Sequence, residues 1–137
     1  MRAREEVISE LVQQWIDKAE KDFGLAEFLL AEARYLDAVG FHAQQAAEKY
    51  IKAFLTEHQI EFPKTHRIEE LLALVAQTDP KLADSLLPAT QLNPYGADIR
   101  YPGDIPELTL ETAAQALNHA ADVRAAIHHA LGLERPH

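Results

Sequence analysis

Cysteine is absent from this chain of 137 residues. Without a thiol there is no disulfide, no thiolate nucleophile and no zinc–thiolate site. The chain also lacks an uninterrupted apolar run of the roughly 20 residues that a membrane-spanning helix needs. Its first residues are charged, unlike the apolar core of a signal segment. We therefore expect a cytoplasmic protein that does not enter a membrane.

Strand patterns and the common catalytic motifs are missing as well. Strict alternation of apolar and polar residues does not occur, and β-branched residues are few and scattered. There is no glycine-rich phosphate loop, no Gly-x-Ser-x-Gly elbow and no paired-carboxylate motif. One Glu-x-x-His pair exists, from Glu134 to His137, and it lies in the C-terminal tail, which argues against a di-iron bundle. We expect neither a metal nor a cofactor.

What the sequence does contain is helical periodicity. Helices are predicted at about 5–33, 36–59, 66–77 and 108–131, with Thr65 as a cap of the third. Asp79-Pro80 is typical of the start of a further short helix, which should end or kink near Pro88. Residues 93–106 are rich in Pro and Gly and predict a loop.

These elements predict an all-α, up-and-down bundle of about five helices. The short link near residues 34 and 35 makes the first two helices a long antiparallel hairpin on which the bundle is built. Gly40 falls inside the second helix and indicates a close approach of another segment. We expect one domain over residues 1–137, with an ordered core at about 5–133 and a loose tail at 134–137.

Two predicted apolar rows contain a charged residue. The first helix has a row at steps of three and four, formed by Trp15, Ala19, Asp22, Ala26, Leu29 and Ala33. The last helix has a row formed by Leu110, Ala114, Leu117, Ala121, Arg124, His128 and Leu131. A lone buried charge is costly. Asp22 and Arg124 should therefore pair with each other or with Glu48, Lys49 or Lys52, unless the helices rotate to expose them.

The second helix is apolar on two sides, which predicts a central position in the bundle. The apolar rows contain Ala43, Ala47, Tyr50, Ile51, Phe54 and Leu55, and the polar row contains His42, Gln45, Lys49, Lys52 and Thr56. An amide beside two ammonium groups suits a phosphate or a nucleotide edge. The same row is also compatible with a solvated face on which Glu48 and Lys52 form an i,i+4 ion pair.

The net charge of −9 argues against nucleic-acid binding by the whole surface. The acidic residues are unevenly distributed, because residues 38–68 carry four Lys or Arg against three Asp or Glu. In the late loop, Arg100 suits a phosphate contact and Tyr101 suits base stacking. Equally, Arg100 could pair with a neighbouring Asp while Tyr101 covers the end of the bundle.

Several of these segments together resemble the HEPN family of small helical domains. They are the stretch from Phe41 to Lys49, then Lys52-Ala53, the Pro63-Lys64-Thr65-His66 turn and Arg100-Tyr101-Pro102, in this order. The resemblance covers nearly the whole chain. It favours a ligand site formed by Gln45, Lys49, Lys52, His66, Arg100 and Tyr101, with Asp22 and Glu48 as buried polar support. It also implies a minimal nucleotidyltransferase of the MNT type as partner, as one half of a toxin–antitoxin pair.

Many HEPN domains are ribonucleases with an Arg followed four to six residues later by a His at a dimer cleft. Arg100 has no His in that window. Arg124 and His129 have the spacing, but five helical positions turn a side chain by about 140°, so that His128 shares the face of Arg124 instead. Arg124, His128 and His129 are therefore weak catalytic candidates.

Three functions remain open at this point. The first is a nucleotide- or RNA-binding module, the second a metal-independent ribonuclease, and the third a helical adaptor without a ligand. We also expect a homodimer, because three short helices are too few to cover two long apolar ones.

Overall fold

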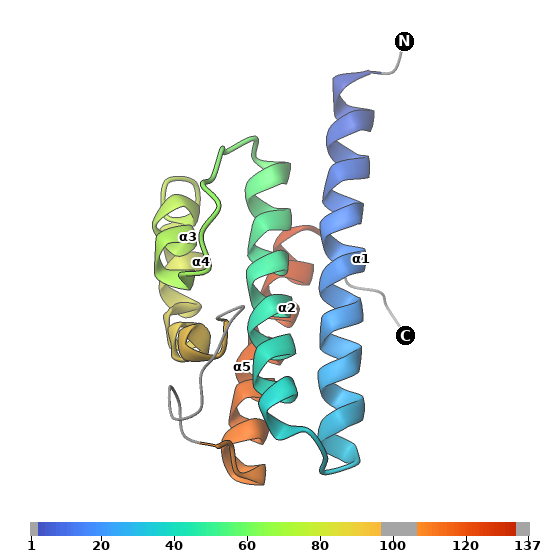
Figure 1. The fold of residues 1–137 in the computed structure, drawn as a ribbon. Coiled ribbons are helices and arrows are strands. Elements are labelled where there is room, and N and C mark those ends of the chain that lie inside the picture. The colour runs from blue at the N-terminus through green and yellow to red at the C-terminus, as the bar shows by residue number, and fades with distance from the viewer. Residues whose placement is uncertain (1–2, 97–106, 134–137) are drawn as a thin grey trace.

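The computed structural model describes residues 3–96 and 107–133, and folds them into helices without any strand (Figure 1). The elements are α1 (Arg4–Ala31), α2 (Leu36–Glu57), α3 (Ile68–Val75), α4 (Pro80–Ser85), the 3-10 helix η1 (Leu87–Tyr95) and α5 (Leu110–Ala130). The all-α class and the long antiparallel hairpin of the first two helices are thus confirmed. No helix in the described residues is long and apolar enough to cross a membrane.

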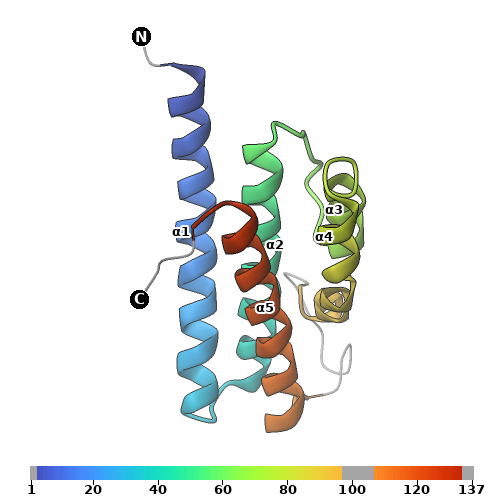
Figure 2. The same cartoon turned by 180° about the vertical axis from the view of Figure 1, so that it is seen from behind.

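Helix α2 lies at the centre of the bundle. Figures 1 and 2 show α1 on one side of it and the short helices α3, α4 and η1 on the other, with α5 crossing behind it in the view of Figure 1. Its buried residues include the whole predicted apolar surface, namely Ala43, Ala47, Tyr50, Ile51, Phe54 and Leu55. Burying a large apolar side chain contributes about 1.5–3 kcal/mol. This helix is therefore the element on which the other helices assemble.

The hairpin turn departs from the predicted end of the first helix. Helix α1 ends at Ala31, and Ala33 adopts a left-handed conformation with a φ of 54°. Tyr35, at the start of α2, has a φ of 53°. Two left-handed residues in so short a link reverse the chain sharply, which is why Ala33 belongs to the turn and not to the apolar row.

Gly40 confirms the expected close approach. A Cβ atom on this residue would lie 2.9 Å from Leu108 Cδ2 and 3.1 Å from the ring of Tyr95. The backbone amide of Leu108 also donates to the Asp37 carboxylate at 3.3 Å. The segments before and after residues 97–106 therefore both pack on the first turns of α2.

Helix α3 begins two residues later than predicted, at Ile68, and Arg67 takes the N-cap position. Thr65 does not cap the helix. Its hydroxyl accepts from the backbone amide of Arg67 at 3.1 Å and donates to Glu70 at 2.5 Å. The extended backbone of Arg67 excludes the earlier start. The buried face of Ile68, Leu71, Leu72 and Val75 is as predicted.

The predicted loop from residue 93 also begins later. Asp79 caps α4 by accepting from the Leu82 amide at 3.1 Å, as predicted, but the chain then continues as η1 to Tyr95. Asn93 belongs to this helix, and its side chain accepts from the Ile68 amide at 2.9 Å. Residues 97–106 of the predicted loop and the tail at 134–137 lie outside the described part of the chain.

Helix α5 is rotated relative to the prediction. Its buried residues are Ala113, Ala116, Ala120, Val123 and Ile127, whereas Leu110 is 53% exposed and Ala114, Leu117 and Ala121 are half-buried. A face made of alanines lets α5 approach α2 closely. This rotation leaves Arg124 and His128 at the edge of the buried face.

Candidate functional site

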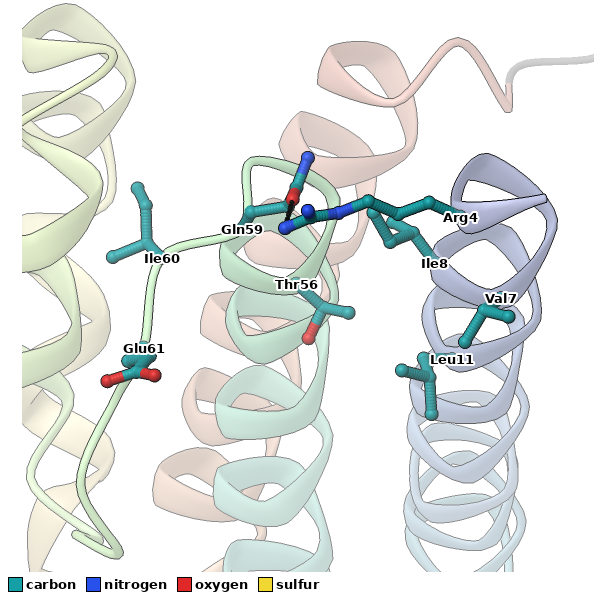
Figure 3. A pocket seen from close by; sticks show the side chains of 8 residues that line it. All are labelled: Arg4, Val7, Ile8, Leu11, Thr56, Gln59, Ile60 and Glu61. Carbon is teal, nitrogen blue, oxygen red and sulfur yellow. Dashed lines mark hydrogen bonds between the residues drawn. The ribbon is translucent and has the colours of Figure 1, made fainter.

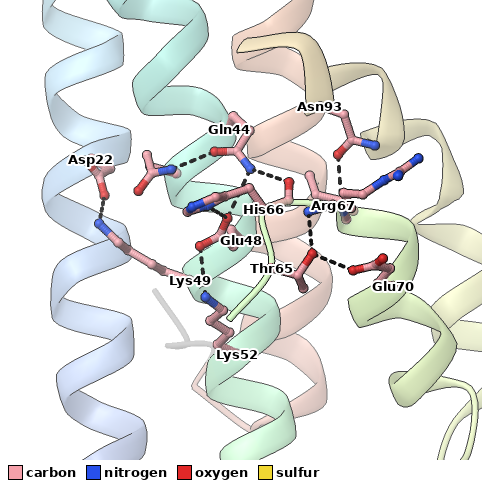
Figure 4. A network of polar contacts seen from close by, with 12 residues as sticks. Asp22, Gln44, Glu48, Lys49, Lys52, Thr65, His66, Arg67, Glu70 and Asn93 are labelled. Carbon is pink, nitrogen blue, oxygen red and sulfur yellow. Dashed lines mark hydrogen bonds and ion pairs between the residues drawn. The ribbon is translucent and has the colours of Figure 1, made fainter. Parts of the chain in front are cut away.

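A buried carboxylate, Glu48, organises the polar side of α2. It is 3% exposed and accepts three hydrogen bonds (Figure 4). Its partners are Lys52 at 2.9 Å, the imidazole Nδ1 of His66 at 3.0 Å and the Gln44 amide at 3.2 Å. Both carboxylate oxygens of Glu48 are therefore hydrogen-bonded, and Glu48 links α2 to the turn that precedes α3.

Lys52 points into the bundle and away from solvent. It is 8% exposed, and it forms an i,i+4 ion pair with Glu48. Its ammonium nitrogen lies 5.5 Å from the ring centre of Trp15 and 5.6 Å from that of Phe62. The two aromatic faces and the carboxylate together replace much of the hydration of this charge. Lys52 thus supports the site from within.

Gln44 connects the parts of this network and was not singled out from the sequence. It is fully buried, and its amide nitrogen donates to Glu48 and, at 3.2 Å, to the backbone carbonyl of His66. Its carbonyl oxygen accepts from Gln45 at 2.8 Å. A Cβ on Gly96 would lie 2.7 Å from the Gln44 side chain. The position of Gln44 among apolar neighbours was the available signal, since a buried amide must be hydrogen-bonded.

Asp22 of α1 forms a second junction with α2. It accepts from Lys49 at 2.5 Å, and its other oxygen lies 2.8 Å from Nδ1 of His42. All three side chains are partly exposed, at 13%, 22% and 24% for Asp22, Lys49 and His42. The prediction that Asp22 needs a partner is confirmed, with Lys49 as one of the partners considered.

The turn before α3 adds exposed basic groups beside these junctions. Lys64, His66 and Arg67 are exposed, and His66 keeps 54% of its side chain accessible while bonded to Glu48. Arg67 lies 3.4 Å from Glu69. Gln45 and Lys49 on α2 are partly exposed on the same polar side. We refer to Gln45 and Lys49 of α2, together with the exposed Lys64, His66 and Arg67 of the turn, as the α2–turn surface.

A separate cluster surrounds Glu20 at the junction of α1, α2 and α5. Arg124 donates to both oxygens of Glu20, at 3.0 and 3.1 Å. The Tyr50 hydroxyl donates at 2.8 Å, and His128 Nε2 lies 2.9 Å from the same carboxylate. Arg124 thus pairs with Glu20, which the sequence analysis did not consider, and not with Asp22. Glu20 was missed because it lies beside the predicted apolar row.

The Glu20 cluster perturbs the ionisation of its members. Desolvation acts to raise the pKa of Glu20, but the hydrogen bonds from Arg124 and Tyr50 and the nearby positive charges outweigh it, so this pKa lies below its ordinary value. Burial, followed by the hydrogen bond to Glu20, raises the pKa of Tyr50 well above its usual range. The hydrogen bond to Glu20 raises the pKa of Arg124. At neutral pH the cluster therefore combines an ionised Glu20, a neutral Tyr50 and a charged Arg124.

The remaining candidate residues from the sequence are His129, Arg100 and Tyr101. His129 is exposed near the C-terminal end of α5 and is not part of the Glu20 cluster described above. Arg100 and Tyr101 lie outside the described residues. Within residues 3–96 and 107–133, no group of three His, Asp or Glu side chains is arranged to hold a metal ion.

This chain is similar to a known protein family and to two solved structures. The family model described as "HEPN domain" matches residues 12–130. The crystal structure of ST0689, an archaeal HEPN homologue, is similar with a TM-score of 0.66 and 25% identity over 85% of this chain and 93% of that one. TT1696 from Thermus thermophilus is similar with a TM-score of 0.70 and 26% identity over 86% and 96% of the two chains.

No curated protein matches the sequence. The family match spans most of the chain, and it includes α2 and the turn before α3 that form the polar surface. The chain belongs to the HEPN domain family.

Proposed function

We propose that the α2–turn surface binds a nucleotide or single-stranded RNA. The observation that carries this proposal is the buried carboxylate of Glu48, which holds His66 and Lys52 while His66 remains 54% exposed. A buried ion pair seldom adds net stability over well-packed apolar residues of the same volume. Here the ion pair lies beneath the exposed imidazole of His66. This arrangement suits a site that must hold polar side chains in fixed orientations.

The chemistry of the surface suits a phosphate-bearing ligand. Lys64 and Arg67 supply exposed cations, and Lys49 supplies an ammonium whose position is set by Asp22. Gln45 carries an amide able to bond a base edge. The surrounding protein is acidic, with a net charge of −9, so polyanions should be repelled elsewhere and tolerated here.

The buried members of the network act through the exposed ones. Lys52 is too enclosed to reach a ligand, so its role is to neutralise Glu48. Gln44 aligns the His66 backbone and the Gln45 side chain. We therefore assign ligand contact to Gln45, Lys49, His66 and the neighbouring basic residues of the turn, and positioning to Gln44, Glu48 and Lys52. No catalytic role is assigned to Arg124 or His128, whose polar atoms are engaged by Glu20.

Family membership supports the further proposal of a nucleotidyltransferase partner of the MNT type, in a toxin–antitoxin pair. Co-expression of this chain with the product of an adjacent nucleotidyltransferase gene tests it. Co-purification of the two proteins in a fixed ratio is the expected result. Purification of each protein alone would leave the chain as an independent binding module and contradict the pairing.

The binding proposal is tested by titrating labelled ATP and a labelled single-stranded RNA at two salt concentrations. We expect the double variant Lys49→Ala with Lys64→Ala to bind RNA at least about tenfold more weakly than the wild type. Each lost phosphate contact should reduce the salt slope by about 0.7.

Lys81→Ala is the matched control, because Lys81 is an exposed lysine on α4 and is not one of the residues of this surface. It should leave binding unchanged. Equal affinity of the wild type, the double variant and the control, with helicity intact by circular dichroism, would contradict a ligand site here and favour an adaptor without a ligand.

A further inference from the structure

The open end of the hairpin formed by α1 and α2 carries an apolar groove (Figure 3). One wall comes from the first turns of α1, with Val7, Ile8 and Leu11. The other wall comes from the end of α2 and the residues after it, with Thr56 and Ile60. The volume of the groove is about 380 Å³. Sites for small molecules typically have about 300–1,000 Å³, so the groove is large enough for a small ligand.

The walls of the groove are mainly aliphatic. Val7 is 37% exposed and Leu11 is 43% exposed. Ile8 and Ile60 are half-buried and pack against the core. None of the described residues that line the groove is aromatic. The groove therefore suits an alkyl chain better than a nucleobase, which is usually held by stacking and by hydrogen bonds to its edges.

Arg4 places a positive charge over the mouth of the groove. Figure 3 shows its side chain reaching from α1 to Gln59, to whose side-chain oxygen it donates at 2.5 Å. Arg4 is exposed and forms no ion pair with a carboxylate of the described residues. A guanidinium has five N–H donors. Most of them therefore stay available to an anion that enters the mouth.

The end of α2 holds the residues beside Arg4 in fixed positions. The Ile60 amide donates to the Leu55 carbonyl at 2.9 Å, and the Gln59 amide donates to the Thr56 carbonyl at 3.0 Å. These two bonds form a Schellman motif, in which glycine usually takes the place of Gln59. Gln59 has a φ of 56°, a left-handed conformation that a side chain disfavours. The side chain at this strained position is the one that holds Arg4, so the mouth of the groove is preorganised.

The charges around the mouth favour one kind of head group. A guanidinium binds a carboxylate or a phosphate through two parallel hydrogen bonds. Glu5 and Glu6 lie in the first turn of α1 beside Arg4, and Glu61 lines the groove. These carboxylates repel a second negative charge more than a first one. A carboxylate with a single charge is therefore favoured over a doubly charged phosphate.

We propose that this groove binds an aliphatic carboxylate, the chemistry of a fatty acid. The carboxylate is bound by Arg4, and the alkyl chain lies between Leu11 and Ile60. Removal of Val7 and Leu11 from water supplies the driving force, because both are exposed in the empty groove. The groove and the α2–turn surface have no residue in common, so this inference does not depend on the proposed ligand of that surface.

The first experiment titrates the protein with hexanoate, octanoate and decanoate, each below its micelle-forming concentration. Backbone amide resonances followed by NMR should shift in a saturable way at Val7, Leu11 and Ile60. The Kd should fall about twofold to fourfold for each added methylene group, depending on how completely the groove covers it. Absence of saturable shifts at these residues, or a Kd that does not change with chain length, overturns the proposal.

The second experiment compares head groups on the same eight-carbon chain. Octanoate should bind about fivefold more tightly than 1-octanol, which lacks the charge, and more tightly than octyl phosphate. Equal affinity for octanoate and 1-octanol would show that Arg4 does not hold the head group. Tighter binding of octyl phosphate would contradict the selection of a single charge. Either result overturns the assignment of a carboxylate.

The third experiment separates the two parts of the site by mutation. Arg4→Met keeps an apolar stem without the charge, and should lower the affinity for octanoate to that for 1-octanol. Leu11→Asn should weaken the binding of both compounds. The matched control is Leu25→Asn, because Leu25 is a leucine of α1 with nearly the same exposure, 41%, and does not line the groove. Unchanged binding by Arg4→Met, or equal effects of Leu11→Asn and Leu25→Asn, overturns the proposal.

Gln59→Gly tests whether Gln59 positions Arg4. Glycine relieves the left-handed strain, so the variant should unfold at a temperature no lower than the wild type. The affinity for octanoate should nevertheless fall about twofold to threefold, because Arg4 is then no longer held over the mouth, whereas that for 1-octanol should not change. Unchanged octanoate binding by this variant would contradict the positioning role of Gln59.

Discussion

Two glutamates, Glu48 and Glu20, each accept hydrogen bonds from three other residues, yet their surroundings differ. The Glu48 side chain is 4% exposed, and its partner Lys52 lies against the rings of Trp15 and Phe62. The Glu20 side chain is 35% exposed, at the edge where α5 meets α1. Water therefore screens the charges around Glu20 and largely fails to screen those around Glu48. Loss of the carboxylate should therefore lower the free energy of unfolding much more in the Glu48 cluster than in the Glu20 cluster.

The difference also separates the two clusters by role. Around Glu48, an exposed imidazole and an exposed basic turn are attached to an enclosed centre. Around Glu20, the polar atoms of Arg124, Tyr50 and His128 are directed at the carboxylate itself. The first arrangement presents groups outward, whereas the second joins three helices.

Loss of the Glu48 carboxylate should have the largest effect. Glu48→Ala leaves the Lys52 ammonium buried without its anion, which typically costs about 3–5 kcal/mol. Urea denaturation of the wild type and the variant measures the free energy of unfolding. Glu48→Leu combined with Lys52→Met should recover most of the loss, because the charge is then removed together with its partner. If Glu48→Ala lowered the free energy of unfolding only as much as the loss of a surface ion pair does, the conclusion that this cluster is enclosed would be contradicted.

A change at Gly96 should have an intermediate effect, transmitted through Gln44. An added Cβ at 2.7 Å from the Gln44 side chain must displace that buried amide, with a cost of about 1–3 kcal/mol from overpacking. Gly24 provides the matched control, since a Cβ there meets nothing within 4 Å and the residue lies inside α1. Thermal unfolding should show Gly96→Ala destabilised and Gly24→Ala stabilised by about 0.5–1 kcal/mol. Equal effects of the two changes on stability would contradict the assignment of Gln44 to the centre of the network.

Removal of the Glu20 charge should have the smallest effect, and one that depends on pH. Glu20→Gln should cost about 1 kcal/mol at pH 7, because the ion pairs are screened by solvent. Since the pKa of Glu20 is lowered in the folded state, its contribution is present above the ordinary value of about 4.3 and is lost as pH falls through the folded pKa. Unfolding curves of the wild type and the variant should therefore converge in acid. A difference that stays constant from neutral to acid pH would contradict this assignment.

The sequence predicted the two-rowed apolar surface of α2 and the buried face of α3, because both have strong helical periods and large apolar residues. The face of α5 was predicted less well. Alanines occupy both sides of this helix, so Ala113, Ala116 and Ala120 are not distinguishable by hydropathy from Ala114 and Ala121. The structure settles the choice by burying Val123 and Ile127 in the core.

Of the contacts in the candidate site, the sequence indicated those that depend on local spacing. The i,i+4 pair of Glu48 and Lys52 follows from spacing on one helix. The contact of His66 with Glu48 joins residues 18 positions apart, and that of Arg124 with Glu20 joins residues 104 apart. Pairings over such separations depend on how the helices assemble, and no local pattern encodes them. The family resemblance indicated His66 as a site residue, but not which carboxylate would hold it.

Gly40 has a consequence for how this protein can change over evolution. Tyr95 and Leu108 both rest on this single glycine, so the chain departs from and returns to nearly the same point on α2. The ends of the intervening segment are thus held by α2 itself. Doubling such a connection costs only about 0.6 kcal/mol in closure entropy. Insertions between residues 97 and 106 should therefore be tolerated by the fold, leaving this position open to diversification among relatives that share the same helices.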